Sequence, residues 1–534
     1  MTRRLALFGA VLVALAAVAG FALATKPATS RSADTAGQAA AVTSINRSCP
    51  PAAPGDDDAR IAMISLPSQP ASSAGSAKTA GVATGSATIS AVPAAPAASA
   101  GSKSAKSAKS AKGKPTASGA PTPSGTPTPS GTGSTGNSAS TAKATPAAPP
   151  TPVTVAEPGD PTTVTAPGGK DGDGISVSAT GEMAMGFEAE QATSAGLGLV
   201  SCSHPSSDMW FVGSGEPDVW LYLTNSGTAE ASVDVTILTD TGQQSGLANA
   251  ITVAPDQVVA ENVSPYVHGS QAIALHVQTS SGQVAASVWE GSGSGHGAWL
   301  PQAAAPSTTV VIPGLTVASS SARLFVTVPG ATDAKVKVVA YTPSGAFTQF
   351  DGIPVQASAA ATTPVTLSSL GASAAGLELT SDVPIVAGVL VPGQGIGSFT
   401  AAAAPVADQG VVAGNPASRG LTVGLLLTAP RTAATASVSV IAADGTVTSP
   451  SALQGVTVAG GHTLAAAVPR PPGREPFAIV LTPRAGSGPL YATRVVTSGT
   501  GGLSAEVASL LPVQSALTQI TLPPVQNAYT AVLP

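Results

Sequence analysis

The clearest alternation of apolar and polar positions runs over residues 219–291. Apolar side chains occupy every second position over residues 233–237, 273–277 and 284–288. A period of two places successive side chains on opposite faces of an extended chain, so each segment predicts a β-strand with one buried face. The turn-forming runs DTG and SSG separate these segments. The stretch therefore predicts an all-β unit.

Weaker copies of this unit follow twice. The second begins RLFVTVPGATDAKVKVVAYTPSG and the third VGLLLTAPRTAATASVSVIAADG, and the turn glycines Gly242, Gly345 and Gly445 lie about 100 residues apart. The closing segments GAWLPQAAAP and GSFTAAAAP also correspond, and GLSAEVASLLP follows them less closely. Units of about 100 residues are typical of immunoglobulin-like or fibronectin-like β-sandwiches. Half-repeats of about 50 residues would favour a β-propeller-like fold instead. The longer period is the clearer one and favours tandem sandwich repeats.

The chain divides into segments of different composition. We expect a signal peptide or N-terminal membrane anchor at 1–24, a spacer at 25–48, an N-terminal β segment at 49–92, a disordered linker at 93–152, a β segment at 153–218, and β repeats at 219–313, 314–413 and 414–534. Ala, Pro, Ser, Thr, Gly and Lys dominate the linker. Such a tract lacks the apolar side chains needed to offset the entropy of ordering.

The N-terminus predicts export from the cytoplasm. The basic start MTRR precedes an apolar run over residues 5–24, which ends in the small-residue site ALA. These features define a secretory signal peptide, cleaved between Ala24 and Thr25. An apolar run of about 20 residues is also long enough to span a bilayer, so an uncleaved anchor is the alternative. Either way, we expect an extracytoplasmic protein that is secreted or associated with the cell envelope.

Composition and charge narrow the class of protein. The chain has 58 Gly and 47 Pro, with only 3% aromatic and 10% charged residues, which favours short strands and turns over long helices. A formal charge of −5 gives no electrostatic footprint for nucleic acid. In an exported chain, the two cysteines Cys49 and Cys202 predict one disulfide around a loop of about 150 residues. Two unpaired thiols are the alternative.

No motif in the sequence specifies catalysis or metal binding. The patterns H-E-x-x-H, G-x-S-x-G, the Walker loop and paired C-x-x-C are absent. The DGDG run at residues 171–174 lacks the downstream Glu of an EF-hand loop. Glu182, Glu188 and Glu190 form an acid/base candidate that rests only on proximity in sequence. We therefore predict a non-enzymatic protein with no catalytic residue, metal site or cofactor.

Aromatic residues single out the first repeat as a candidate binding module. All four tryptophans, Trp210, Trp220, Trp289 and Trp299, lie between residues 204 and 299, as do four of the five histidines. Indole faces stack well on sugars and other flat ligands, whereas packing within or between domains is the alternative role of such residues.

Several motifs in this region occur together in one known family. The run SCSHPSSDMWFVGSG, followed by LYLTNSG, AIALHVQTSSGQVAASVWE and GAWLPQAAAP, resembles a family of secreted actinobacterial proteins catalogued only as a domain of unknown function. The resemblance covers most of the chain outside the signal and linker, and the spacing of Cys49 and Cys202 fits the family's pattern around a large variable insert. It implies export, an all-β build and residence in the cell envelope. It supplies no catalytic residues.

Two hypotheses for function follow. The first is a secreted or cell-envelope protein that acts as a structural or interaction scaffold, based on the repeated strand modules and the export signal. The second is a carbohydrate-binding module that uses the Trp-rich first repeat. The expected partner is cell-wall polysaccharide or another envelope protein. We expect no contact with nucleic acid, and contact with the membrane only through the N-terminal segment.

Overall fold

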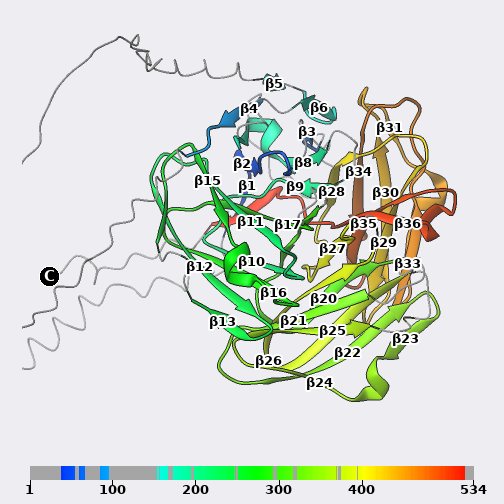
Figure 1. The fold of residues 1–534 in the computed structure, drawn as a ribbon. Helices are drawn as coiled ribbons and strands as arrows, with labels where there is room; N and C mark the ends of the chain where they lie inside the picture. Colours follow the sequence, from blue (N-terminus) through cyan, green and yellow to red (C-terminus); the bar gives the residue numbers. More distant parts are fainter. Residues whose placement is uncertain are drawn as a thin grey trace, which may run out of the picture.

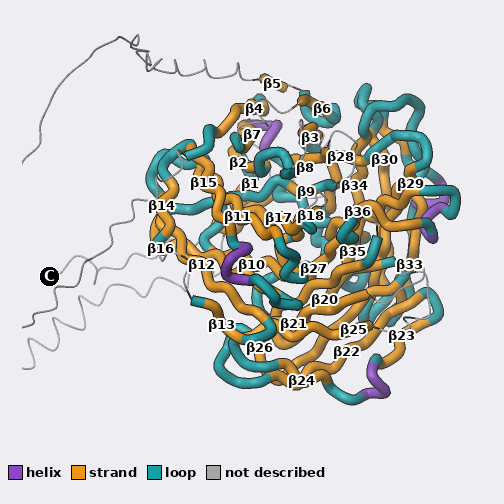
Figure 2. Tube along the Cα trace, in the orientation of Figure 1, coloured by secondary structure: helices purple, strands orange, loops and turns teal. Residues whose placement is uncertain are grey.

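A computed structural model describes residues 38–54, 59–66, 85–95, 153–155, 157–165, 172–193, 198–245, 247, 250–292, 297–316, 322–367, 370, 374–393 and 395–522. The expected signal peptide or anchor, its cleavage site, most of the spacer and linker residues 96–152 lie outside these residues. The described chain is all-β, and its helical segments are short turns (Figure 2). No helix in this part of the chain is long and apolar enough to cross a membrane.

Strands on both sides of residues 96–152 form one unit, the N-terminal sandwich. Its sheets have the orders β2-β7-β4-β5 and β6-β3-β8-β9. Ile61, Ile89 and Val177 come from both sheets and share one buried core. The elements are β2 (Ser44–Cys49), β3 (Ala59–Ile64), β4 (Ala87–Val92), β5 (Val153–Val155), β6 (Thr162–Thr165), β7 (Gly174–Thr180), η2 (Gly181–Ala184), β8 (Glu188–Thr193) and β9 (Val200–Ser201).

The first sandwich follows directly. One sheet has the order β13-β12-β16-β10-β19, with β14 also paired to β12, and the other has the order β15-β11-β17-β18. The unit begins before residue 219, because β10 pairs with β16 in the middle of the first sheet. The elements are β10 (Asp208–Gly213), β11 (Asp218–Asn225), β12 (Ala231–Thr239), β13 (Gly242–Gln244), β14 (Ile251–Val253), β15 (Gln257–Asn262), α2 (Ser264–Val267), β16 (Ile273–Ser281), β17 (Ala285–Gly291), β18 (Gly297–Leu300) and β19 (Gln302–Ala303).

In the second sandwich, one long strand serves both sheets. The first half of β26 (Ala375–Val391) pairs with β20 and β22, and its second half pairs with β21 and β27. The remaining elements are β20 (Ser307–Leu315), β21 (Ala322–Val328), β22 (Ala334–Thr342), β23 (Gly345–Thr348), η3 (Phe350–Gly352), β24 (Val355–Ala357), β25 (Ala361–Leu367) and β27 (Ser398–Ala401).

The third sandwich repeats the strand order of the N-terminal one. Its sheets are β28-β34-β30-β31, with β32 also paired to β30, and β33-β29-β35-β36. The elements are β28 (Gly410–Asn415), β29 (Leu421–Ala429), β30 (Ala434–Ile441), β31 (Val447–Thr448), η4 (Ser451–Leu453), β32 (Val456–Val458), β33 (His462–Ala467), β34 (Phe477–Pro483), β35 (Tyr491–Ser498), η5 (Gly502–Ser504) and β36 (Glu506–Pro512).

The fold therefore contains a fourth copy of the unit whose three copies are visible as sequence repeats. In each unit two sheets enclose a common core, which distinguishes a sandwich from the single-sheet blade of a propeller. The recurring turn glycines have a local cause. Gly242 and Gly345 adopt φ values of 110° and 119°, which residues with a Cβ rarely adopt, and they open the short hairpin strands β13 and β23.

The four sandwiches surround a common centre. In Figure 1 the N-terminal sandwich lies at the top, and the green first, yellow-green second and orange third sandwiches follow around the ring. Strand β1 (Gln38–Ala41) pairs antiparallel with β37 (Gln519–Leu522), so the two ends of the described chain meet. The first two apolar clusters, centred on the first and second sandwiches, each include residues of the next sandwich. Two further clusters cover the contacts of the N-terminal sandwich with the third and the first.

Hydrogen bonds also join every pair of neighbours. They use backbone groups or buried side chains. One example from each junction around the ring is Ala95 N to Val258 O at 2.7 Å, Thr362 Oγ1 to Leu238 O at 3.0 Å, Gly376 N to Thr463 Oγ1 at 3.0 Å, and Gly414 N to Glu190 Oε2 at 3.2 Å.

The first sandwich buries one carboxyl group completely. Glu290 on β17 is fully buried and accepts hydrogen bonds from Ser214 N at 3.1 Å, Ser214 Oγ at 2.8 Å and Gly215 N at 3.1 Å. A Cβ at position 213 would collide with this carboxyl, so Gly213 makes room for it. Burial raises the pKa of Glu290 to about 7, and the hydrogen bonds from Ser214 and Gly215 oppose the shift.

This raised pKa predicts a pH dependence of stability. The ordinary pKa of the carboxyl is 4.5, so between pH 4.5 and about 7 the folded chain binds more protons than the unfolded chain. Stability present below pH 4.5 is therefore lost as pH rises through 7, by an amount on the order of 3 kcal/mol for this group. Glu290→Gln should reduce the difference between the unfolding free energies measured in urea at pH 5 and pH 8. Burial also raises the pKa of Glu188 to about 7, so part of the difference should remain. An unchanged difference in the variant would contradict the assignment.

Candidate functional site

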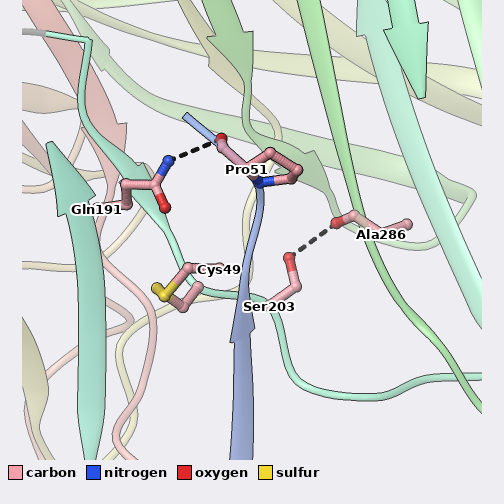
Figure 3. The surroundings of a disulfide bond; sticks show 6 residues. Cys49, Pro51, Gln191, Ser203 and Ala286 are labelled. Carbon is pink, nitrogen blue, oxygen red and sulfur yellow. Dashed lines mark hydrogen bonds between the residues drawn. A yellow bond between two sulfur atoms is a disulfide. The ribbon is translucent and has the colours of Figure 1, made fainter. Parts of the chain in front are cut away.

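The disulfide and a backbone bridge join β2 to the segment after β9. Cys49 and Cys202 form a disulfide with their Cα atoms 4.2 Å apart. At the adjacent position, Ser48 N donates to Ser203 O at 2.8 Å and Ser203 N donates to Ser48 O at 2.9 Å. Ser203 Oγ also donates to Ala286 O of the first sandwich at 2.9 Å (Figure 3). The segment after β9 is thus fixed to two sandwiches.

This antiparallel register places Arg47 opposite His204. The two residues are one position beyond the Ser48–Ser203 bridge, and they line the same cavity. Burial lowers the pKa of His204, and the positive charge of Arg47 lowers it further. At neutral pH His204 is therefore an uncharged imidazole, with one ring nitrogen that donates and one that accepts a hydrogen bond.

The cavity lies at the centre of the ring and has a volume of about 390 Å³. It is bounded by Arg47 on β2, by residues of β19, and by the segments that follow β9, β27 and β36, so all four units contribute to it. Its polar lining consists of Arg47, His204, Gln302, Gln514 and Ser515. Its apolar lining consists of the alanines at 303–305 and 402–404 with Pro512, Val513 and Leu517.

Arg47 is the buried cation of this site. Arg47 is only 3% exposed. Its Nη2 atom forms an ion pair with Glu188 Oε1 and donates a hydrogen bond to Phe187 O at 3.4 Å. Its Nε is buried and has no hydrogen-bond partner among the described residues. Burial raises the pKa of Glu188, while Arg47 opposes the rise. Arg47 therefore retains donor capacity beside the cavity.

The other polar side chains differ in how far they are already used. Ser515 Oγ accepts from Ala407 N at 2.9 Å and donates to Pro405 O at 3.4 Å, so it mainly holds the joining segments together. Within the described part of the chain, the amides of Gln302 and Gln514 form no hydrogen bond. Each can therefore offer a donor and an acceptor to a bound molecule.

The structure does not bring the four tryptophans together in an open cleft. Trp220, Trp289 and Trp299 lie directly opposite one another across β11, β17 and β18. Trp289 and Trp299 are 2% and 6% exposed, and Trp220 is half-buried. They pack with Val92 and Val200 at the contact between the first and N-terminal sandwiches. These three residues therefore hold two units together.

Trp210 lies in the other sheet of the first sandwich. It is 4% exposed, belongs to that sandwich's core, and stacks on His276 with ring centroids 3.8 Å apart and planes at 12°. Trp210 is therefore also a packing residue, which is the alternative to ligand binding.

Two of the three acidic candidates, Glu188 and Glu190, have basic partners. Glu188 pairs with Arg47, and Glu190 pairs with Arg494 at 3.4 Å. Glu182 lies in the short turn η2. In the described ranges there is no group of three or more His, Cys, Asp or Glu residues that could hold a metal ion.

Sequence analysis did not select Arg47, Gln302 or Gln514. A signal was nevertheless present, because the closing segments of the repeats correspond in sequence and these segments form much of the cavity wall. His204 was visible only as one histidine of the Trp-rich region. Its pairing with Arg47 depends on a fold that joins positions far apart in the chain.

The fold and the cavity define a class of protein, in which four all-β sandwiches form a ring around a small central pocket. The chain belongs to a family of unknown function (DUF5719), whose model matches residues 163–469, more than half of its length. The matched range begins in β6 and ends just after β33, and it includes His204 and Gln302. No curated protein and no solved structure matches the chain.

Proposed function

We propose that the protein is a non-enzymatic scaffold of the cell envelope that presents the surfaces of its sandwich ring to a partner. The observation that carries this proposal is the closed ring, in which each sandwich is held by two neighbours through buried contacts. Such an arrangement restricts relative motion of the units and keeps their exposed surfaces in fixed positions. The partner is another envelope protein or cell-wall polysaccharide.

The location rests on the N-terminal sequence. A signal peptide cleaved between Ala24 and Thr25 would release the ring outside the cytoplasm, whereas an uncleaved segment 1–24 would tether it to the membrane. A disulfide between Cys49 and Cys202 agrees with an oxidising compartment.

Photo-cross-linking of the full chain in its own cells tests the scaffold function. A photo-reactive residue is placed at Ile353 or Val447, which are 71% and 56% exposed on the second and third sandwiches. We expect a discrete adduct with an envelope component in the extracytoplasmic fraction. The matched control places the same residue at the buried Val440, where no adduct should form.

Two results would overturn the proposal. One is a chain that stays in the cytoplasm. The other is turnover of a cell-wall polymer by the purified chain, abolished by a single carboxylate substitution such as Glu188→Gln.

A further inference from the structure

The central cavity contains a buried cation with an unused donor. The Arg47 hydrogen bonds to Phe187 and Glu188 both come from Nη2, and the buried Nε has no partner among the described residues. A buried donor without an acceptor is costly, and structures satisfy nearly all such groups. Nε itself is closed off from solvent, but another part of the side chain lines a cavity of about 390 Å³, so the positive charge of Arg47 lies beside that cavity. A buried cation beside a cavity favours a bound oxygen acceptor there.

The charges around Arg47 favour an acceptor with a single negative charge. A guanidinium forms its strongest hydrogen bonds with oxyanions such as carboxylates and phosphates. Glu188 already lies against Arg47, and Glu190 follows two positions along the same strand and pairs with Arg494. A dianion would be repelled more strongly by these carboxyl groups than a monoanion would. His204, the other titratable group facing Arg47, is uncharged at neutral pH and adds hydrogen bonds without charge.

The other residues that line the cavity indicate which further groups a bound molecule carries. Alanines from two joining segments form a wall of methyl groups, which suits a small apolar group. The amides of Gln302 and Gln514 are free to pair with a polar group such as an amide or hydroxyl. Pockets for small ligands have volumes of roughly 300–1,000 Å³, and this cavity lies at the small end of that range.

We propose that the central cavity is a binding site for a small monocarboxylate that also carries an amide or hydroxyl group. The positive charge of Arg47 attracts the carboxylate, and His204 donates a hydrogen bond to the same group. Gln302 and Gln514 bind the second polar group, and the alanine wall packs against the short apolar part. This site goes beyond the scaffold function, because it concerns a solvent-accessible pocket between the sandwiches rather than the exposed surfaces of single sandwiches.

The test uses the full oxidised chain and three probes, observed by ligand-detected NMR at pH 7. N-acetyl-L-alanine carries a carboxylate, an amide and a methyl group. N-acetyl-L-alanine methylamide has the same shape without the charge, and inorganic phosphate supplies the other oxyanion. We expect N-acetyl-L-alanine to bind, the methylamide to bind at least tenfold more weakly, and phosphate not to displace the acid.

Variants of the lining locate the binding. Arg47→Gln should weaken binding of N-acetyl-L-alanine at least tenfold, since it removes the charge that faces the carboxylate. Ala304→Leu should weaken binding to a similar degree because it fills the cavity while leaving the charges in place. Gln356→Leu, on the exposed strand β24, is the matched control and should leave binding unchanged. If Arg47→Gln does not fold, Ala304→Leu decides the question.

Four results would overturn the proposal. They are no saturable binding of N-acetyl-L-alanine, equal binding of the acid and the methylamide, unchanged binding in both Arg47→Gln and Ala304→Leu, and displacement of the acid by phosphate. The last result would assign the cavity to a phosphate instead. None of these outcomes bears on the cross-linking of the outer surface, so the two proposals fail independently.

Discussion

Replacing both cysteines by alanine, Cys49→Ala with Cys202→Ala, should lower the free energy of unfolding by about 4 kcal/mol. The disulfide joins positions 153 apart in the sequence, and closing a long loop removes much conformational freedom from the unfolded chain. Both residues are buried in the core of the N-terminal sandwich, so the change also removes packing there. Chemical denaturation of the oxidised protein and the variant measures the difference.

The same substitution tests the role of the disulfide in the cavity. The Ser48–Ser203 bridge and the Arg47–His204 pair follow the disulfide in the same register, so its loss should also loosen the cavity. The control is the wild-type chain unfolded with and without reductant, which should reproduce the loss without any change of sequence. Equal stability of the oxidised chain and the double variant would contradict this account.

The strands of the repeats could be predicted from the sequence because their alternation is local. The segments at 233–237, 273–277 and 284–288 all fall within or at the start of observed strands, β12, β16 and β17. The alternation predicted one buried face for each strand, but in some strands both faces are buried. Every residue of β17 and of β28 is buried, because one face of each strand packs in its own sandwich and the other meets a neighbouring sandwich.

The fourth sandwich and the cavity depend on contacts that no local pattern reveals. β4 pairs with β5 and β7 across residues 96–152, so two halves of a sheet are separated by a long tract of different composition. The two cysteines were the only sign that these halves belong together. The tryptophans illustrate the opposite problem, since an indole at a sugar site and an indole between two sandwiches have the same local sequence.

Breaking the ion pair between Arg494 of the third sandwich and Glu190 of the N-terminal sandwich should lower the free energy of unfolding even more than loss of the disulfide. Arg494 on β35 is fully buried, and Glu190 on β8 accepts from Arg494 Nη1 at 3.4 Å and from Ala413 N and Gly414 N at 3.2 Å each. Glu190→Ala leaves a buried guanidinium without its counter-charge and two backbone donors without an acceptor. We expect a loss of about 5 kcal/mol in the free energy of unfolding, measured by chemical denaturation.

A double-mutant cycle separates the charge from the packing. Burial lowers the pKa of Arg494 and Glu190 opposes this shift, so the cation depends on its partner. Combining Glu190→Ala with Arg494→Met removes the isolated charge, and the pair should therefore cost several kcal/mol less than the sum of the single variants. Arg431→Met is the matched control, because Arg431 pairs with Glu378 at 3.1 Å but its side chain is 70% exposed. It should cost less than Glu190→Ala, because Glu378 keeps 10% of its side chain exposed to water whereas Arg494 is fully buried. Additive effects of Glu190→Ala and Arg494→Met would show that the ion pair does not join the two sandwiches.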